Sequence, residues 1–161
     1  MARRASAPTR AVGVVQDAGV DHWLHRYEHD PDAESYGLEA AVALDVDPAL
    51  VHKTLLVDMS SGLGVAIVPV ERQVDLKAVA GALGVRRVQM ADPAVAQRRT
   101  GYVVGGISPL GQAHRHATVL DAGATTHPTI FVSGGRRGLE IELSPADLVR
   151  LTGAVLAAIA R

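Results

Sequence analysis

Two apolar runs around a glycine-containing turn constrain the fold of this chain more than any other feature. The runs are TLLVDM (residues 54–59) and GVAIVPV (residues 64–70), and they flank the turn SSGLG (residues 60–64). Short runs of apolar and β-branched residues on both sides of such a turn are typical of a β-hairpin. The sequence therefore predicts an antiparallel pair of buried strands.

The other segments mix helical and strand-like patterns without a strict β-α-β alternation. Further strands are predicted at residues 23–29, 86–90, 116–123, 129–135 and 139–143. Helices are predicted at residues 10–19, 35–46, 75–84, 92–99 and 144–161, with a helical turn at 47–53. This mixture is typical of an α+β fold built around a mixed sheet. We predict a single domain over residues 10–161, preceded by a flexible tail at residues 1–9.

Composition excludes several classes of protein. Of the 161 residues, 48% are hydrophobic and 20% are charged, which is typical of a globular chain and not of a disordered one. The net charge of −1 excludes a basic field over the whole molecule, so a polyanion would have to bind a local patch. The chain has no cysteine, which excludes disulfides, thiolate metal sites and a cysteine nucleophile. Because no apolar run fits a signal peptide or a membrane span, we expect a cytoplasmic protein.

Neither a metal site nor a protein nucleophile stands out. The three histidines of residues 22–29 would share a face only on a helix, whereas their segment is predicted to be a strand. Ser133 lies in VSGG, which lacks the G-x-S-x-G pattern of a nucleophile elbow. We therefore predict no metal and no cofactor. A metal-dependent hydrolase that uses His114 and His116 is the alternative.

Three features could contribute to a ligand site. The stretch GYVVGGISPLG (residues 101–111) holds four glycines and a proline but no charge, so it is either an apolar connection or a cradle of backbone N–H groups. Lys53, one of only two lysines, lies where a helical turn passes into a buried strand, and its ammonium could donate to a ligand oxygen. Glu140 shares with Glu142 a strand face that is usually solvated, but it follows glycine-rich turns and could face a cleft.

Paired arginines are the remaining charged feature. Such pairs usually lie on a solvated surface, and they would bind phosphates if they converged on one rim. The pairs are Arg86–Arg87, Arg98–Arg99 and Arg136–Arg137.

Several segments, in the same order, closely resemble the YbaK proteins. That family of free-standing aminoacyl-tRNA deacylases is similar to the editing (INS) domain of prolyl-tRNA synthetase. The resemblance runs from about Tyr27 to Arg161 and is carried by YEHDP, HKTLL, DLKAVAGALG, MADPAVAQRRTGYVVGGISPLG and TIFVSGGRRGLEIEL. It implies the fold of the editing domain, with a central mixed, barrel-like sheet surrounded by helices. It also implies hydrolysis of mischarged Cys-tRNA(Pro), with Cys-tRNA(Cys) as a further substrate.

The resemblance also implies which residues form the site. The family's G-x-x-x-P loop maps to residues 105–109, whose backbone N–H groups would hold the aminoacyl carbonyl. The family's lysine maps to Lys53, which would anchor the 3′-terminal adenosine and its phosphate. The loop consists of Gly105, Gly106, Ile107, Ser108 and Pro109. The residues expected to line the substrate pocket are Tyr27, Tyr36, Ser133, Gly134 and Glu140.

In cysteine-specific members of the family, the substrate's own thiol attacks its ester carbonyl. A chain without a cysteine or a catalytic triad fits such chemistry, because the protein then supplies only positioning and oxyanion donors. The implied partners are the acceptor end of tRNA(Pro) and prolyl-tRNA synthetase, with the chain as a monomer or weak homodimer. The alternatives are an Ala- or Ser-specific deacylase and a module that binds tRNA ends or nucleotides without hydrolysis.

Overall fold

The computed structural model describes residues 7–161, and residues 1–6 of the predicted tail lie outside this range. Its α-helices are α1 (Arg10–Ala18), α2 (Tyr36–Leu44), α3 (Leu76–Leu83), α4 (Pro93–Thr100) and α5 (Pro145–Thr152), and its 3-10 turns are η1 (Pro48–Leu50) and η2 (Ala122–Thr126). Its strands are β1 (His22–Arg26), β2 (His52–Asp58), β3 (Leu63–Pro69), β4 (Gln89–Met90), β5 (Ala117–Asp121), β6 (Ile130–Ser133), β7 (Leu139–Leu143) and β8 (Val155–Ala157).

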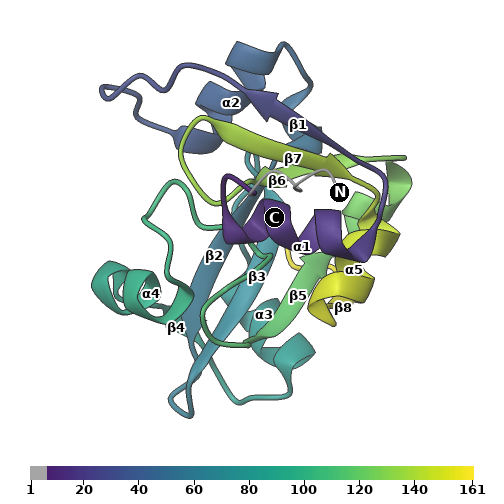
Figure 1. The fold of residues 1–161 in the computed structure, drawn as a ribbon. Helices are drawn as coiled ribbons and strands as arrows, with labels where there is room; N and C mark the ends of the chain where they lie inside the picture. Colours follow the sequence, from purple (N-terminus) through teal and green to yellow (C-terminus); the bar gives the residue numbers. More distant parts are fainter. Residues whose placement is uncertain (1–6) are drawn as a thin grey trace.

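The strands of residues 7–161 form two sheets (Figure 1). The larger sheet has the order β4-β2-β3-β5-β8 and contains the predicted antiparallel β2–β3 hairpin. It is mixed, because β5 runs parallel to both β3 and β8. The smaller sheet, β1-β7-β6, is antiparallel. One parallel bridge between Val51 and Phe131 joins the two sheets, which do not close into a barrel. The α+β fold with a mixed sheet is therefore confirmed.

The main hydrophobic core lies between the two sheets and is closed by α1. Leu139 and Ile141 of β7 point into it and meet Ile67 of β3 and Leu120 of β5, all fully buried. A second cluster fills the space between the larger sheet and α3. A third cluster lies under α2, where it packs against Phe131 and the start of β2. The opposite face of β7, which carries Glu140, is thereby covered by α2 rather than by solvent.

The prediction of one long C-terminal helix was wrong beyond Thr152. Helix α5 ends at Gly153, which has a φ of 70° and so takes the left-handed conformation of a C-cap. The chain then continues as β8, which pairs with β5. Asp121 fixes this end, because its Oδ1 accepts hydrogen bonds from the N–H groups of Ile159 (3.0 Å) and Ala160 (3.1 Å). Alanine-rich sequence favours a helix locally, but pairing along the sheet edge and the buried carboxylate outweigh that propensity.

No helix within residues 7–161 is long and apolar enough to cross a membrane.

Candidate active site

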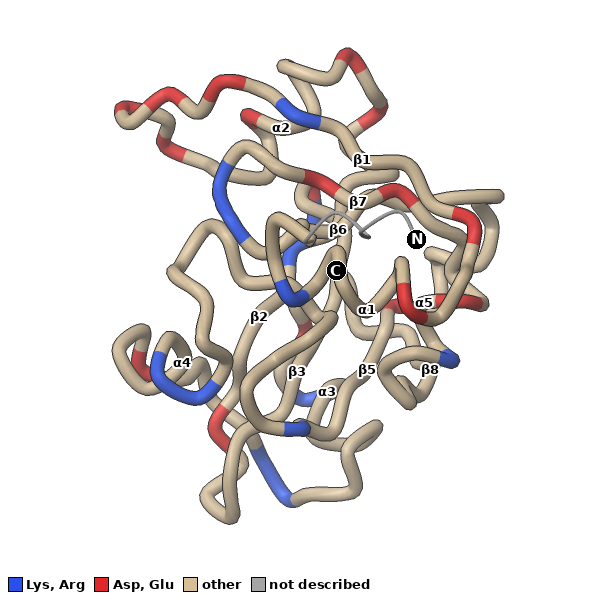
Figure 2. The backbone as a smooth tube through the Cα atoms, viewed as in Figure 1, with Lys and Arg blue, Asp and Glu red and all other residues tan. Residues whose placement is uncertain are grey.

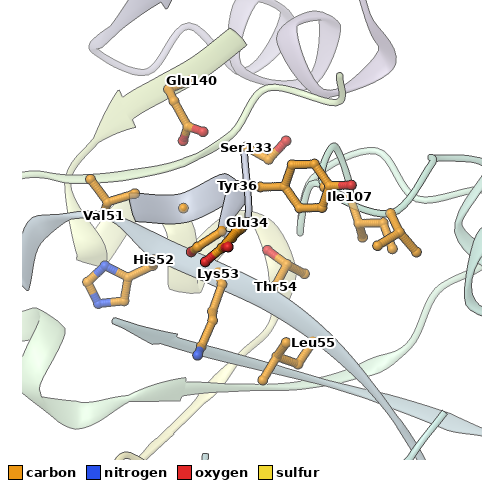
Figure 3. A pocket seen from close by; sticks show the side chains of 14 residues that line it. Glu34, Tyr36, Val51, His52, Lys53, Thr54, Leu55, Ile107, Ser133 and Glu140 are labelled. Carbon is orange, nitrogen blue, oxygen red and sulfur yellow. The ribbon is translucent and has the colours of Figure 1, made fainter. Parts of the chain in front are cut away.

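A cavity of about 300 Å³ opens where the two sheets separate (Figure 3). One wall is the start of β2, a second is the loop after α4, and a third is the segment that leads into α2. The smaller sheet contributes one residue from β6 and one from β7. The lining residues are Glu34, Ser35, Tyr36, Gly37, Val51, His52, Lys53, Thr54, Leu55, Val104, Gly105, Ile107, Ser133 and Glu140.

The loop wall is held in place by Arg137. Its guanidinium donates from Nε (2.9 Å) and a terminal nitrogen (2.6 Å) to the carbonyl oxygen of Val104, and it lies 4.8 Å from the ring centroid of Tyr36. Gly105 has a φ of +87°, and a Cβ there would lie 2.8 Å from Cγ of Tyr36. Gly106 is packed against the backbone of Arg136, 2.8 Å from where its Cβ would stand. Both glycines are therefore required so that the backbone can approach its neighbours.

Two residues of this loop line the cavity and have an N–H group without an acceptor in the described part of the chain. The N–H of Gly106 donates to the carbonyl of Val103 (2.8 Å) and so forms a turn. The two residues are Gly105 and Ile107, the two members of residues 105–109 in the cavity lining, and their N–H groups have no acceptor within residues 7–161. They are the candidate backbone donors of the predicted cradle.

Lys53 supplies the cation of the cavity. Its side chain is half-buried, and this burial lowers the pKa of its ammonium. Within residues 7–161 the ammonium has neither a hydrogen bond nor an ion pair. A partly desolvated ammonium without a partner is a strong charge-assisted donor to an incoming anionic or carbonyl oxygen.

Glu140 lies at the opposite end of the cavity from the Lys53 ammonium (Figure 3). Its side chain is 7% exposed, and Oε2 is buried without a hydrogen-bond partner. Burial raises the pKa of this carboxyl from 4.5 to about 8, so it is neutral at pH 7. Glu140 thus faces the cavity and not solvent, the less usual of the two orientations considered from sequence.

The structure brings six of the predicted site residues to the cavity and places the other five outside its lining. Those at the cavity are Tyr36, Lys53, Gly105, Ile107, Ser133 and Glu140. Those outside are Tyr27, Gly106, Ser108, Pro109 and Gly134.

The residues outside the lining support the walls. Ser108 is fully buried, and its Oγ accepts from the N–H of Leu110 (3.2 Å). Pro109 is buried beside it. Gly134 donates its N–H to Leu139 O (2.7 Å) and ends the β6–β7 pairing.

Tyr27 packs under α2, next to the position of Glu140. Burial, with a further contribution from the Glu140 charge, raises the pKa of the Tyr27 phenol to about 12. The phenol therefore remains protonated at neutral pH.

Sequence reasoning missed four polar residues of the cavity lining, and two of them, His52 and Thr54, lie on β2; the other two are Glu34 and Ser35. His52 is 3% exposed, and its Nδ1 donates to the carbonyl of Leu50 (3.0 Å), which leaves Nε2 as an acceptor without a partner. Burial lowers the pKa of this imidazole, so it is neutral. The Thr54 hydroxyl is also buried without a partner. The sequence HKTLL (residues 52–56) begins with three polar residues although the rest of the strand is apolar, and this pattern could have indicated a polar site at the start of the strand.

The alternative chemistries gain no support from the geometry. Ser133 Oγ accepts from the N–H of Gly135 (3.2 Å), and no histidine of residues 7–161 hydrogen-bonds to it. His25 pairs instead with Glu142 (2.9 Å). No three histidine or carboxylate side chains in the described part of the chain gather as a metal site.

Basic and acidic residues are distributed unevenly along the backbone (Figure 2). The turn between β6 and β7 carries Arg136–Arg137, and the last turn of α4 carries Arg98–Arg99, whereas the segment before α2 is acidic. Arg136 is exposed and available, whereas Arg137 is bound to the loop. Two of the arginine pairs are thus next to the loop wall: Arg137 of one pair contacts Val104, and Arg98–Arg99 lie just before the loop in the chain.

Two backbone donors without an acceptor, an unpaired ammonium and a neutral carboxyl thus line one small cavity. Such groups are suited to a ligand that carries a carbonyl or anionic oxygen. Comparison with known proteins identifies the family. Residues 30–151 match the family described as aminoacyl-tRNA editing domain, and the chain belongs to this family. Editing of an aminoacyl-tRNA is hydrolysis of the ester between amino acid and tRNA, so the chain belongs to a family of hydrolases.

Individual relatives agree with this assignment. The chain is 32% identical over 161 residues to EbsC of Enterococcus faecalis, which is provisionally named a Cys-tRNA(Pro)/Cys-tRNA(Cys) deacylase; the match covers 98% of this chain and 96% of EbsC. Among solved structures, hypothetical protein APE2540 matches with a TM-score of 0.85 at 25% identity, covering 95% of this chain and 100% of that one. A provisionally named trans-editing enzyme for prolyl tRNA synthetase has the same fold, with a TM-score of 0.84 at 22% identity over 98% of this chain and 99% of that one. The resemblance predicted from sequence is confirmed.

Proposed function

We propose that this protein is a trans-editing deacylase that hydrolyses Cys-tRNA(Pro), with Cys-tRNA(Cys) as a second substrate. The observation that carries the proposal is the cavity itself, which combines free carbonyl-binding donors with no positioned nucleophile among residues 7–161. The name of the Enterococcus faecalis relative, which matches over nearly the whole chain, supports the choice of cysteine. The acceptor end of tRNA is the partner, and prolyl-tRNA synthetase supplies the tRNA selection that a near-neutral chain lacks.

In the proposed mechanism the substrate provides the nucleophile. The cysteine sulfur forms a bond to its own ester carbonyl carbon, and the bond from that carbon to the ribose oxygen breaks. The ribose oxygen leaves with the proton that the thiol gives up, and water then opens the cyclic thioester to free cysteine. The protein contributes orientation of the thiol and stabilisation of the carbonyl oxygen.

Each cavity residue has a role in this scheme. The N–H groups of Gly105 and Ile107 donate to the carbonyl oxygen as negative charge develops on it. Lys53 binds the phosphate of the terminal nucleotide at the other end of the cavity. Glu140 binds the α-amino group, and when an ammonium binds there the carboxyl gives up its proton, because an opposite charge favours the ionised form.

The proposal is tested by the release of cysteine from charged tRNA(Pro) in the presence of purified protein. Wild type is expected to release cysteine, and Lys53→Ala is expected to lower kcat/KM by about tenfold to a hundredfold, because a hydrogen bond between charged groups contributes about 1.5–3 kcal/mol. The chain offers a matched control, Lys77→Ala, because Lys77 is its only other lysine and is exposed on α3. Equal rates for Lys53→Ala and Lys77→Ala would show that Lys53 does not bind the substrate.

A further inference from the structure

Thr54 lies on the outer edge of β2, whose hydrogen-bonding direction is fixed by the register. The carbonyl of Val51 accepts from the N–H of Val70 (2.8 Å), so the odd-numbered residues of this strand exchange hydrogen bonds with β3. The even-numbered residues face the other way, as the hydrogen bond from Ala91 N to Leu56 O (3.0 Å) shows. The main-chain N–H and C=O of Thr54 therefore point away from β3.

Neither neighbouring strand reaches Thr54. On one side, β4 pairs with residues 57 and 58 of β2. The same register, continued along the chain, would place Thr54 opposite Pro93, which has no N–H and is the first residue of α4. On the other side, β6 joins β2 through the single bridge between Val51 and Phe131. The edge of β2 thus has a gap one residue wide, at a residue whose hydroxyl is also buried and unpartnered.

The cavity opens onto this gap. Residues 51–55 all line the cavity. Because alternate side chains of a strand point to opposite faces of the sheet, five consecutive lining residues indicate that the cavity meets the edge of the strand and not one of its faces. The facing edge belongs to β6. Because Gly134 N donates to Leu139 O (2.7 Å), the main chain of Ser133 points away from β7 and toward β2.

We propose that this gap binds the adenine base of the 3′-terminal nucleotide through the main chain of Thr54. The Thr54 N–H donates to adenine N1, and its C=O accepts from the N6 amino group. A one-residue gap is too short to pair with a peptide strand but offers one donor beside one acceptor, which matches the Watson–Crick edge of an unstacked base. This inference rests on the proposed function, and it adds base recognition to a site whose Lys53, the preceding residue in the chain, binds the phosphate.

The test replaces the terminal base of the substrate. Minihelices of the acceptor stem, chemically charged with cysteine, end in adenosine, 7-deazaadenosine or inosine. In 7-deazaadenosine N1 and N6 are kept, whereas inosine has a donor at N1 and an acceptor at C6. We expect 7-deazaadenosine to behave as adenosine does and inosine to lower kcat/KM by about a hundredfold, because two hydrogen bonds are lost and their partners stay buried. Equal hydrolysis of the adenosine and inosine substrates would overturn the inference, as would an equal loss with 7-deazaadenosine.

Two further measurements separate this inference from the proposed function. Binding of uncharged minihelices is measured by NMR titration, and tighter binding of the adenosine form than the inosine form supports the inference even if no charged substrate is hydrolysed. Thr54→Val keeps the main chain and is expected to keep the preference for adenosine, whereas Thr54→Pro removes the outward N–H and is expected to lose it. A preference lost in Thr54→Val would assign the recognition to the hydroxyl and contradict the inference. If Thr54→Pro does not fold, the comparison of minihelices that end in adenosine, 7-deazaadenosine and inosine still tests the inference.

Discussion

Replacement of Glu140 by glutamine tests the electrostatics of the cavity without a substrate. In the native protein this carboxyl has a pKa of about 8 because it is buried, whereas its ordinary value is 4.5. Between these pH values the native state holds a proton that the unfolded state has lost, so stability falls as pH rises. The slope is about 1.4 kcal/mol per pH unit, which amounts to about 3 kcal/mol between pH 5.5 and 7.5. A glutamine side chain at this position would be neutral in both states and would not contribute this slope.

The assay is urea unfolding of wild type and Glu140→Gln at several pH values from 5.5 to 7.5. Titration of the histidines contributes equally to the free energy of unfolding of both proteins and so cancels in the difference between them. As the pH rises over this range, the difference is expected to grow by about 3 kcal/mol in favour of the variant. Thr54→Val, a non-titrating change in the same cavity, serves as control and should give a curve parallel to that of wild type. If the difference in free energy of unfolding between wild type and Glu140→Gln does not change with pH, Glu140 is not a neutral carboxyl in the native protein, and the reasoning is refuted.

Three further changes test the walls and the fold. Gly105→Ala, at a φ of +87° and 2.8 Å from Tyr36, should lower kcat/KM at least ~10-fold and cost about 1 kcal/mol of stability; unchanged deacylation would contradict its role. Arg137→Gln frees the loop carbonyl and should raise KM while the free energy of unfolding in urea changes by less than about 1 kcal/mol, because the side chain is exposed. Asp121→Ala leaves three N–H groups unpaired, those of Gly123, Ala160 and the buried Ile159, and should cost about 3 kcal/mol; a loss below ~1 kcal/mol in thermal unfolding would show that water replaces the carboxylate.

The sequence was sufficient for the elements that local patterns determine. The β2–β3 hairpin is formed where two apolar runs flank a turn. Asp75 and Asp92 precede helices α3 and α4 and cap them with their carboxylates, and a glycine in the left-handed conformation follows each helix. These features depend on residues that are close together in the sequence.

Features that depend on distant contacts could not be predicted in this way. The C-terminal segment resembles a helix, but β8 pairs with β5, and Asp121 binds the N–H groups that follow it. The burial of Glu140 results from α2 lying over β7, and the free edge at Thr54 results from the point at which β4 ends. Family resemblance located the glycine loop and Lys53, but it did not indicate which loop N–H groups remain free.

The central claim, that the substrate supplies the nucleophile, is tested most directly by comparing Cys-tRNA(Pro) with Ser-tRNA(Pro). The two esters differ only in one side-chain atom, which is sulfur in cysteine and oxygen in serine, so the same cavity can hold both. We predict rapid release of cysteine and little release of serine above the uncatalysed rate. Efficient hydrolysis of the seryl ester would contradict the account, because the protein would then have to supply the attacking group or activate a water molecule.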